Sequence, residues 1–272
     1  MKSLAQRLAP LAAALLLLGA APPLAAAQGR RPPRDVGGTS LLLEVKADAA
    51  SAARSVERTA AVIQRRCARL GIYCRLGPPP GGNANRLLLR FSAASDPGRV
   101  KKILLAEGLE LRPVFSVPHP FPMLEYPTRA EAEAVAVATA DADVFPLEGY
   151  GEREAYVITA RDPVITGDDL RDPVVMRAPR DTPGGGYVVD CRLRPAGARR
   201  LKAWTTGNTN AYAALVYNGR ALVTLYVKAP VWYNVVVSGG FSRRQAEDAA
   251  VVLASGNLPA PVGVLEEGTY TP

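Results

Sequence analysis

The first third of the chain alternates between the spacing of strands and that of helices. Residues 41–45 are an apolar run with the length of a buried strand. A helix is predicted next, because apolar positions recur every three or four residues: Val56, Ala60, Ile63, Cys67 and Leu70. The pattern continues with strands over 72–76 and 87–91, a helix begun by Asp96 and Pro97, and a strand over 109–115. The order β-α-β-β-α-β predicts a ferredoxin-like sandwich with both helices on one face of an antiparallel sheet.

The second half predicts another α+β unit. Residues 187–193 alternate as a strand, and a helix is expected around 198–204. Asn218-Gly219 lies between two apolar strands and is a strong hairpin signal, because both turn positions favour positive φ. A further strand is predicted over 232–237.

The last predicted helix begins with a capping box, in which Ser242 and Gln245 satisfy each other's backbone, and Gly256 ends it. Beyond it, residues 262–267 alternate like a strand and have no helix left to pack with. We therefore expect this segment to return to the first unit. Residues 117–150 are proline-rich, with one short helical signal over 128–140, and are interpreted as an insertion.

The N-terminus has the pattern of a secretory signal peptide over residues 1–27. Lys2 and Arg7 precede an apolar run, and three alanines end the segment at a site that a signal peptidase would read. A linker over 28–36 follows. The alternative is an uncleaved membrane anchor, although the run is shorter than the ~20 residues of a spanning helix. The expected product starts at Gln28, is soluble and lies in the periplasm.

Composition and charge narrow the classes of partner. Hydrophobic residues make up 48% of the chain, which is typical of a globular protein. The net charge of +8 favours acidic partners. No run of Lys and Arg interleaved with aromatic residues is present, so nucleic acid is not expected as a partner.

Catalytic, metal and cofactor sites are not predicted. The single histidine, His119, lies in a proline-rich stretch with no nucleophile motif beside it. Asp141 with Asp143, and Asp168 with Asp169, lack the spaced oxygen donors of a calcium loop. The glycine run 184–186 is not followed by the Lys-Ser/Thr of a phosphate loop. A hydrolase is therefore disfavoured, and binding is the expected activity.

The three cysteines give one candidate disulfide. Cys67 ends the first helix and Cys74 lies on the next strand, so an oxidising periplasm could join them. The alternative is two buried free thiols. Cys191 shares a strand face with apolar neighbours and is expected to be buried and unpaired.

Several motifs resemble the first periplasmic domain of the SecD/SecDF protein-export family. The residues that carry the likeness are Gly37-Gly38-Thr39 before the first strand, Arg66 with Leu70-Gly71 ("RNRVxxLG"), residues 166–170 ("TGxDL"), and Ser238-Gly239 with Phe241 ("SGxF"). The most specific match is to "AxxxAxxLxxGxLPAP", carried by Ala246, Ala250, Leu253, Gly256, Leu258, Pro259, Ala260 and Pro261. The resemblance spans residues 37–267.

The resemblance implies a base subdomain over 37–115, with the return segment 262–267, and a head subdomain over 116–261. It implies an accessory role in protein export, in contact with unfolded or translocating polypeptide and with membrane components of the Sec translocon. The family's membrane helices have no counterpart here, so proton conduction is not expected. The rival hypothesis is a solitary module of this fold that binds an unrelated envelope partner.

Aromatic residues are the candidate polypeptide contacts. Trp232 and Tyr233 could form a gripping surface, although aromatic side chains are more often buried in cores. Tyr226 lies near the position of a proline that the family has in the preceding strand, and it completes the candidate set.

Overall fold

A computed structural model describes residues 34–48, 50–79, 81–93, 96–115, 125–148, 154–180, 182 and 185–272. The predicted signal peptide, most of the predicted linker and His119 lie outside these residues. Among the helices that the structure describes, none has the length and apolar character needed to span a bilayer.

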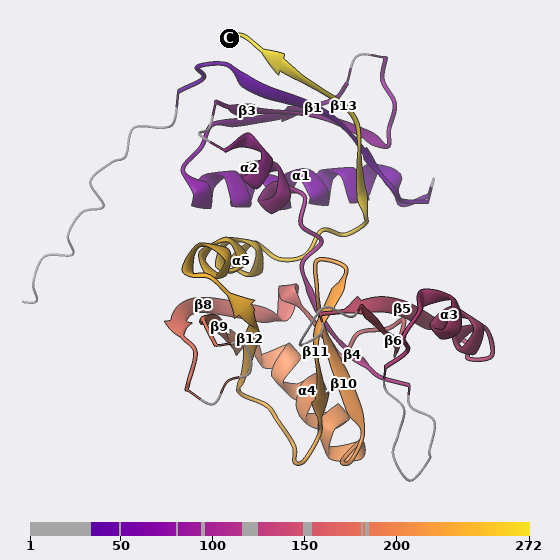
Figure 1. Cartoon of the computed structure of the whole chain (residues 1–272). Helices are drawn as coiled ribbons and strands as arrows, with labels where there is room; N and C mark the ends of the chain where they lie inside the picture. The colour runs from indigo at the N-terminus through magenta and orange to yellow at the C-terminus, as the bar shows by residue number, and fades with distance from the viewer. Residues whose placement is uncertain are drawn as a thin grey trace, which may run out of the picture. The chain divides into compact units, whose positions relative to one another are not determined.

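The base is an antiparallel sheet with two helices on one face (Figure 1). Its elements are β1 (Gly38–Val45), α1 (Ala52–Leu70), β2 (Cys74–Gly77), β3 (Arg86–Ser92), α2 (Pro97–Leu104) and β13 (Val262–Tyr270). The strand order is β13-β1-β3-β2. Leu41 and Leu43 of β1 pack with Ile63 of α1 and Phe91 of β3 in a closed core. The predicted α+β class with a ferredoxin-like base is confirmed.

The fourth strand of the base differs from the prediction. Residues 109–115 were expected to fill this place, but β4 (Leu109–Pro113) pairs antiparallel with a head strand, and Leu109 and Leu111 pack in the core of the head. The segment that completes the base is β13, which pairs with β1 from Val262 to Tyr270. Alternation along a strand predicts which face is buried and not which neighbour the strand takes. By its strand pairing, β4 belongs to the head, so the boundary between base and head lies before Leu109.

The described residues of the head form two sheets and three α-helices. Its elements are β4, α3 (Arg129–Val137), β5 (Ala142–Leu147), β6 (Ala155–Ala160), β7 (Ile165–Thr166), the 3-10 turn η1 (Gly167–Asp169), β8 (Leu170–Arg177), β9 (Tyr187–Leu193), α4 (Pro195–Gly207), β10 (Tyr212–Tyr217), β11 (Arg220–Tyr226), β12 (Asn234–Phe241) and α5 (Arg243–Ser255). The larger sheet has the order β6-β5-β11-β10-β4-β7, and the smaller one has the order β12-β9-β8. One core, around Leu215, Val189 and Leu253, joins both sheets to α5.

The region interpreted as an insertion is part of the larger sheet. The predicted helix is present as α3, capped by the Thr128 side chain, which accepts a hydrogen bond from the Glu131 N–H at 3.2 Å. The strand β5 was not predicted. It pairs with β6 and touches β11 through Leu147 and Ala221, which extends the sheet beside α3 (Figure 1).

The two segments that connect the base to the head lie side by side. The backbone N–H of Leu258 donates to the carbonyl of Glu107 at 2.9 Å, between the end of α2 and the start of β13. The predicted turn at Asn218-Gly219 packs against this crossing, since the Asn218 side-chain oxygen accepts from the Glu107 N–H at 3.0 Å. Both turn residues have positive φ, 51° and 75°.

Candidate functional site

Arginines of the base helix α1 bind the C-terminal end of the head helix α5. The guanidinium of Arg66 is fully buried; it donates to the carbonyls of Ile103, Leu104 and Ala106, and to that of Gly256 at 3.0 Å. Arg65 donates twice to the Ser255 carbonyl, and Arg69 donates once to that of Ala254. The last carbonyls of a helix have no partner within it and favour cations, so α1 caps α5.

Burial lowers the pKa of Arg66 to about 10, so its guanidinium stays charged at neutral pH. A buried charge needs such a set of acceptors, because an unpaired one is costly. Arg66 therefore fixes the base to the head.

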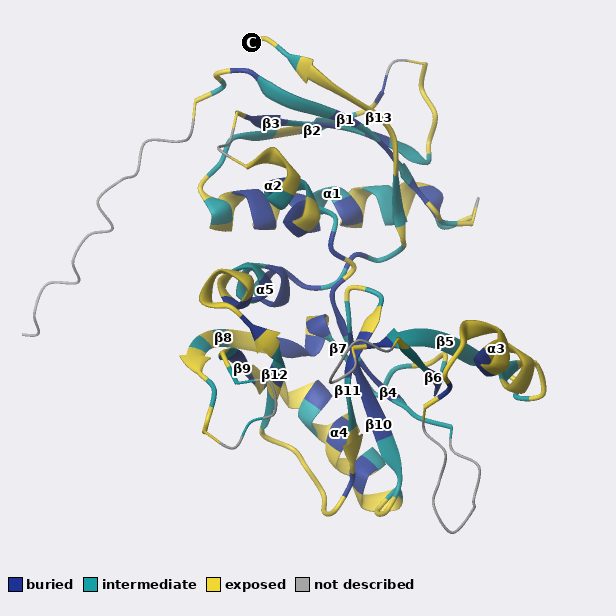
Figure 2. Cartoon of the chain, in the orientation of Figure 1, coloured by how far each residue is buried: buried dark blue, intermediate teal, exposed yellow. Residues whose placement is uncertain are grey.

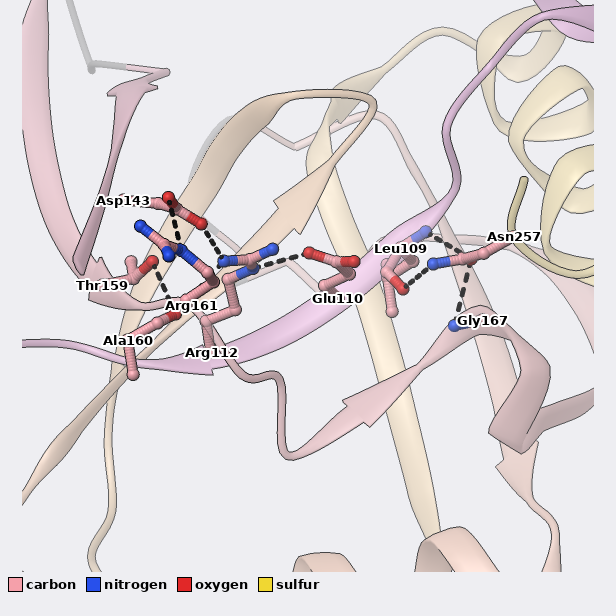
Figure 3. Close-up of polar contacts among 9 residues, drawn as sticks. All are labelled: Leu109, Glu110, Arg112, Asp143, Thr159, Ala160, Arg161, Gly167 and Asn257. Carbon is pink, nitrogen blue, oxygen red and sulfur yellow. Dashed lines mark hydrogen bonds and ion pairs between the residues drawn. The ribbon is translucent and has the colours of Figure 1, made fainter. Parts of the chain in front are cut away.

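Asn257 ties three segments of the head together (Figure 3). Its side-chain oxygen accepts from the N–H groups of Leu109 and Gly167, at 3.0 and 3.1 Å, and its amide group donates to the Leu109 carbonyl at 2.9 Å. A side chain at Gly108 or Gly167 would collide with this amide. Asn257 thus holds β4 and η1 against the end of α5.

A charged cluster around Arg112 lies on the larger sheet (Figure 3). Arg112, 9% exposed, binds Glu110 at 2.6 Å and Asp143 at 2.7 Å, and it donates to the Ala160 carbonyl. Arg161 also faces Asp143, at 3.5 Å. The cluster joins β4 to β5 and β6.

Oppositely charged side chains pair across the junction of base and head. A cavity of about 750 Å³ lies between α2, α5 and the β10–β11 turn. Arg99 and Asp248 form an ion pair across it, and Arg244 faces Asp96 at 3.5 Å. Among the described residues no group of histidine, cysteine or acidic side chains is arranged to hold a metal ion. The arrangement accounts for cohesion between base and head.

The predicted aromatic contacts are exposed. Trp232 and Tyr233 are 48% and 67% exposed, and their ring centroids lie 6.3 Å apart. They precede β12, where the Tyr233 carbonyl accepts from Leu193 and the Trp232 ring lies 5.3 Å from the Lys202 ammonium. Tyr226 is 44% exposed but belongs to a separate pair with Tyr212 at 5.2 Å. The structure therefore brings two of the three residues together.

An open apolar face of the smaller sheet was missed by the sequence analysis. Val174, Met176 and Val236 are 55%, 44% and 47% exposed. Figure 2 shows β8 largely in the colour of exposed residues. Val174 and Val236 both align with Asp190 of the central strand, so they share one face. The short apolar run Val174–Met176 was the only signal of this strand, and exposure cannot be read from it.

The cysteines have the arrangement considered from the sequence. Cys67 and Cys74 are joined by a disulfide with Cα atoms 6.1 Å apart, which lies within the usual range. Cys191 is a free thiol, fully buried between β8 and β12, and burial raises its pKa to about 12.

The fold and these surfaces define a two-part domain, in which a head with exposed aromatic and apolar residues is inserted into a ferredoxin-like base. Residues 142–260 match the family described as "SecDF, P1 head subdomain". The chain is 27% identical over 224 residues to the protein translocase subunit SecD of Koribacter versatilis, covering 80% of this chain and 39% of that protein. It is 33% identical over 111 residues to SecD of Rhodobacter capsulatus, covering 40% and 19%.

A solved structure shares the fold. The structure entitled "Structure and function of a membrane component SecDF that enhances protein export" has a TM-score of 0.60 at 20% identity, over 84% of this chain and 98% of that one. Residues 142–260 thus match the head subdomain of a SecDF first periplasmic domain, and the chain resembles SecD proteins in sequence and a SecDF structure in fold, as its motifs indicated. It spans about two fifths or less of the two curated relatives named above.

Proposed function

We propose that this chain is an accessory of protein export that binds unfolded or translocating polypeptide outside the cytoplasmic membrane. Its relatives are named protein translocase subunits, and its P1-type head and base match theirs. The proposed partners are a polypeptide in transit and the membrane components of a Sec translocon. Periplasmic location after cleavage of residues 1–27 belongs to the same proposal.

One observation carries the proposal: the exposed pair Trp232 and Tyr233. Trp and Tyr side chains are largely buried on average, and neighbouring exposed apolar side chains that form a contiguous patch are typical of binding surfaces. Thr205 and Lys202 of α4 support the loop, because the Thr205 hydroxyl accepts from the Val231 N–H at 3.0 Å and Lys202 lies over the Trp232 ring. Apolar side chains of an unfolded chain can pack on such a pair, whereas a folded protein keeps them buried.

The proposed action is passive binding without turnover or cofactor. The exposed loop and the paired charges at the junction provide contact and cohesion, and the net charge of +8 steers acidic segments towards the surface.

The test compares binding to one secretory protein in two states: reduced and carboxymethylated, and folded with its disulfides intact. The immobilised chain is expected to bind the unfolded state at least tenfold more tightly. Trp232→Ala with Tyr233→Ala should weaken this binding about tenfold, whereas Val137→Ala, an exposed position on α3, should leave it unchanged. Equal or undetectable binding of both states would overturn the proposal and favour an unrelated envelope partner.

Tyr226 needs its own variant because it lies in a different ring pair. Its hydroxyl donates to the Asn210 side chain at 2.5 Å, so its ring is held in place. If Tyr226 belongs to the same contact surface, Tyr226→Ala will weaken binding of the unfolded protein, and combining it with the Trp232 and Tyr233 changes will weaken it further.

A further inference from the structure

The smaller sheet of the head has a free edge at β8. In the order β12-β9-β8, the strand Leu170–Arg177 pairs on one side with β9 and has no strand on its other side among the described residues. A free edge presents unpaired backbone groups, to which an extended chain can add as a further strand.

The register and one hydrogen bond show which backbone groups are free. The N–H of Ala178 donates to the Gly186 carbonyl at 3.0 Å, so Ala178 bonds to the chain of β9. Met176 and Val174, two and four residues before it, lie opposite Val188 and Asp190 and bond to β9 in the same way. In an antiparallel pair, residues alternate between bonding the partner and pointing away from it. The N–H and C=O groups of Val175 and Arg177 therefore point outwards from the edge.

The free edge of β8 is limited at both ends by residues that cannot continue the strand pairing. The register with β9 shifts between Arg171 and Val174, and Asp172 there has a φ of 51°. Pro173 follows and cannot donate a hydrogen bond, and Pro179 lies just beyond the strand. Only residues 174–177 are available for pairing, which favours brief, reversible contacts with a passing chain.

Side chains and charge define the occupant. Val174 and Met176 form an exposed apolar row on one side of the edge, and they match apolar residues at every second position of an added strand. Arg177 points to the opposite side and is exposed. Among the described residues no carboxylate lies within ion-pair distance of Arg177. Acidic residues of the added strand, at the positions that alternate with its apolar residues, would therefore complement this charge.

We infer that the β8 edge binds an extended acidic segment of polypeptide as an added strand, with apolar residues at alternate positions. This inference rests on the proposed function and assigns it a second contact, made through the main chain. The aromatic pair would hold side chains, whereas the edge would hold the backbone of any segment with the right alternation.

The test uses a fluorescein-labelled peptide of four Val-Glu repeats, measured by anisotropy against the full chain. Two peptides serve as controls: one of four Val-Lys repeats, and one with four valines followed by four glutamates. The alternating acidic peptide is expected to bind at least fivefold more tightly than either control. Equal binding of all three would overturn the inference.

Two variants of one residue separate the backbone donor from the charge. Arg177→Gln removes the charge and keeps the outward N–H, whereas Arg177→Pro removes both, at a position where an edge strand tolerates proline. We expect the Kd of the Val-Glu peptide to rise about threefold with Arg177→Gln and at least tenfold with Arg177→Pro. Equal effects of the two variants would exclude strand addition.

Hydrogen exchange of the wild-type chain provides a readout that does not depend on folding of a variant. Saturating Val-Glu peptide should slow exchange at the amides of Val175 and Arg177 at least tenfold, but not at Met176, which already bonds to β9. Unchanged exchange at both outward amides would also overturn the inference. If unfolded protein still binds and the Trp232 and Tyr233 variant still weakens it, the proposed function stands while the edge site fails.

Discussion

Arg66 of the base donates a hydrogen bond to the carbonyl of Gly256 in the head, 190 residues further along the chain. The same guanidinium binds three carbonyls at the end of α2, so one side chain joins the α1, α2 and α5 regions.

Replacing Arg66 should therefore destabilise the whole domain. Arg66→Met leaves four buried carbonyls without this donor, and we expect the free energy of unfolding to fall by about 3–5 kcal/mol, as measured by urea denaturation. Arg65→Met is the matched control at the preceding position of α1. Arg65 is exposed, and a loss of about 1 kcal/mol is expected. Similar losses for both would argue against a special role of Arg66.

Asn257→Asp tests the amide that binds β4 and η1. A carboxylate can still accept from the Leu109 and Gly167 N–H groups, but it has no donor for the Leu109 carbonyl and repels it. The expected loss is about 2–3 kcal/mol of unfolding free energy at pH 7, with partial recovery at low pH, where the acid regains a proton to donate. If the difference in unfolding free energy between the variant and the parent did not change with pH, this account would be contradicted.

The Arg112 cluster should show coupling between its members. Arg112→Met leaves Glu110 and Asp143 without their shared cation, and a loss of about 3 kcal/mol is expected. Adding Asp143→Asn to this variant removes one of the two remaining negative charges and should restore part of the loss. A double-mutant cycle by urea denaturation measures this coupling, and strict additivity would count against the cluster.

Thiol titration checks the cysteine assignment. The native chain should show no reactive thiol, because Cys191 is buried and the other two are bonded. One thiol is expected after unfolding without reductant, and three after reduction. Replacing both Cys67 and Cys74 by Ala should cost about 2 kcal/mol, since the bond closes a short loop. Three thiols in the unfolded, unreduced chain would show that the bond is absent.

Tyr217 should contribute to alkaline unfolding. Burial raises its pKa to about 12, from an ordinary value of 10, so the folded state holds the phenol proton more tightly than the unfolded state. The resulting stability is fully present below pH 10 and is lost as the pH rises to about 12. The Tyr217→Phe variant should show a smaller decline of stability over this window than the parent. Identical declines would show that Tyr217 does not contribute.

The sequence predicted correctly those helices and turns that are determined by residues close together in the chain. The capping box at Ser242 and Gln245 forms as expected, and the turn at Asn218-Gly219 has the positive φ values that its residues favour. These features require only a few adjacent residues. The helix α1 was equally clear, because its apolar stripe runs along its full length.

Features that depend on distant residues could not be predicted. The partner of β4 is decided by whether Leu109 and Leu111 enter the core of the base or that of the head, and both are apolar. The burial of Arg66 depends on carbonyls 37 to 190 positions away. The open face at Val174 and Met176 has a sequence that would suit a covered strand equally well. For the candidate site, the sequence pointed to Trp232 and Tyr233, which the structure shows exposed and adjacent; their contact with polypeptide stays a prediction.

The hydrogen bond between Leu258 and Glu107 brings the two ends of the head together, so the head is an insertion with adjacent ends. Both crossings between the two parts lie at a single point, so residues between them could be exchanged for another inserted domain, or for a short turn, without moving the ends of the base. Because Gly38 and Tyr270 are paired at the far end of the same sheet, the base could in turn be spliced into a host protein through one loop. The domain thus has two sites at which a sequence can be joined or exchanged: the crossing at Glu107 and Leu258, and the paired ends at Gly38 and Tyr270.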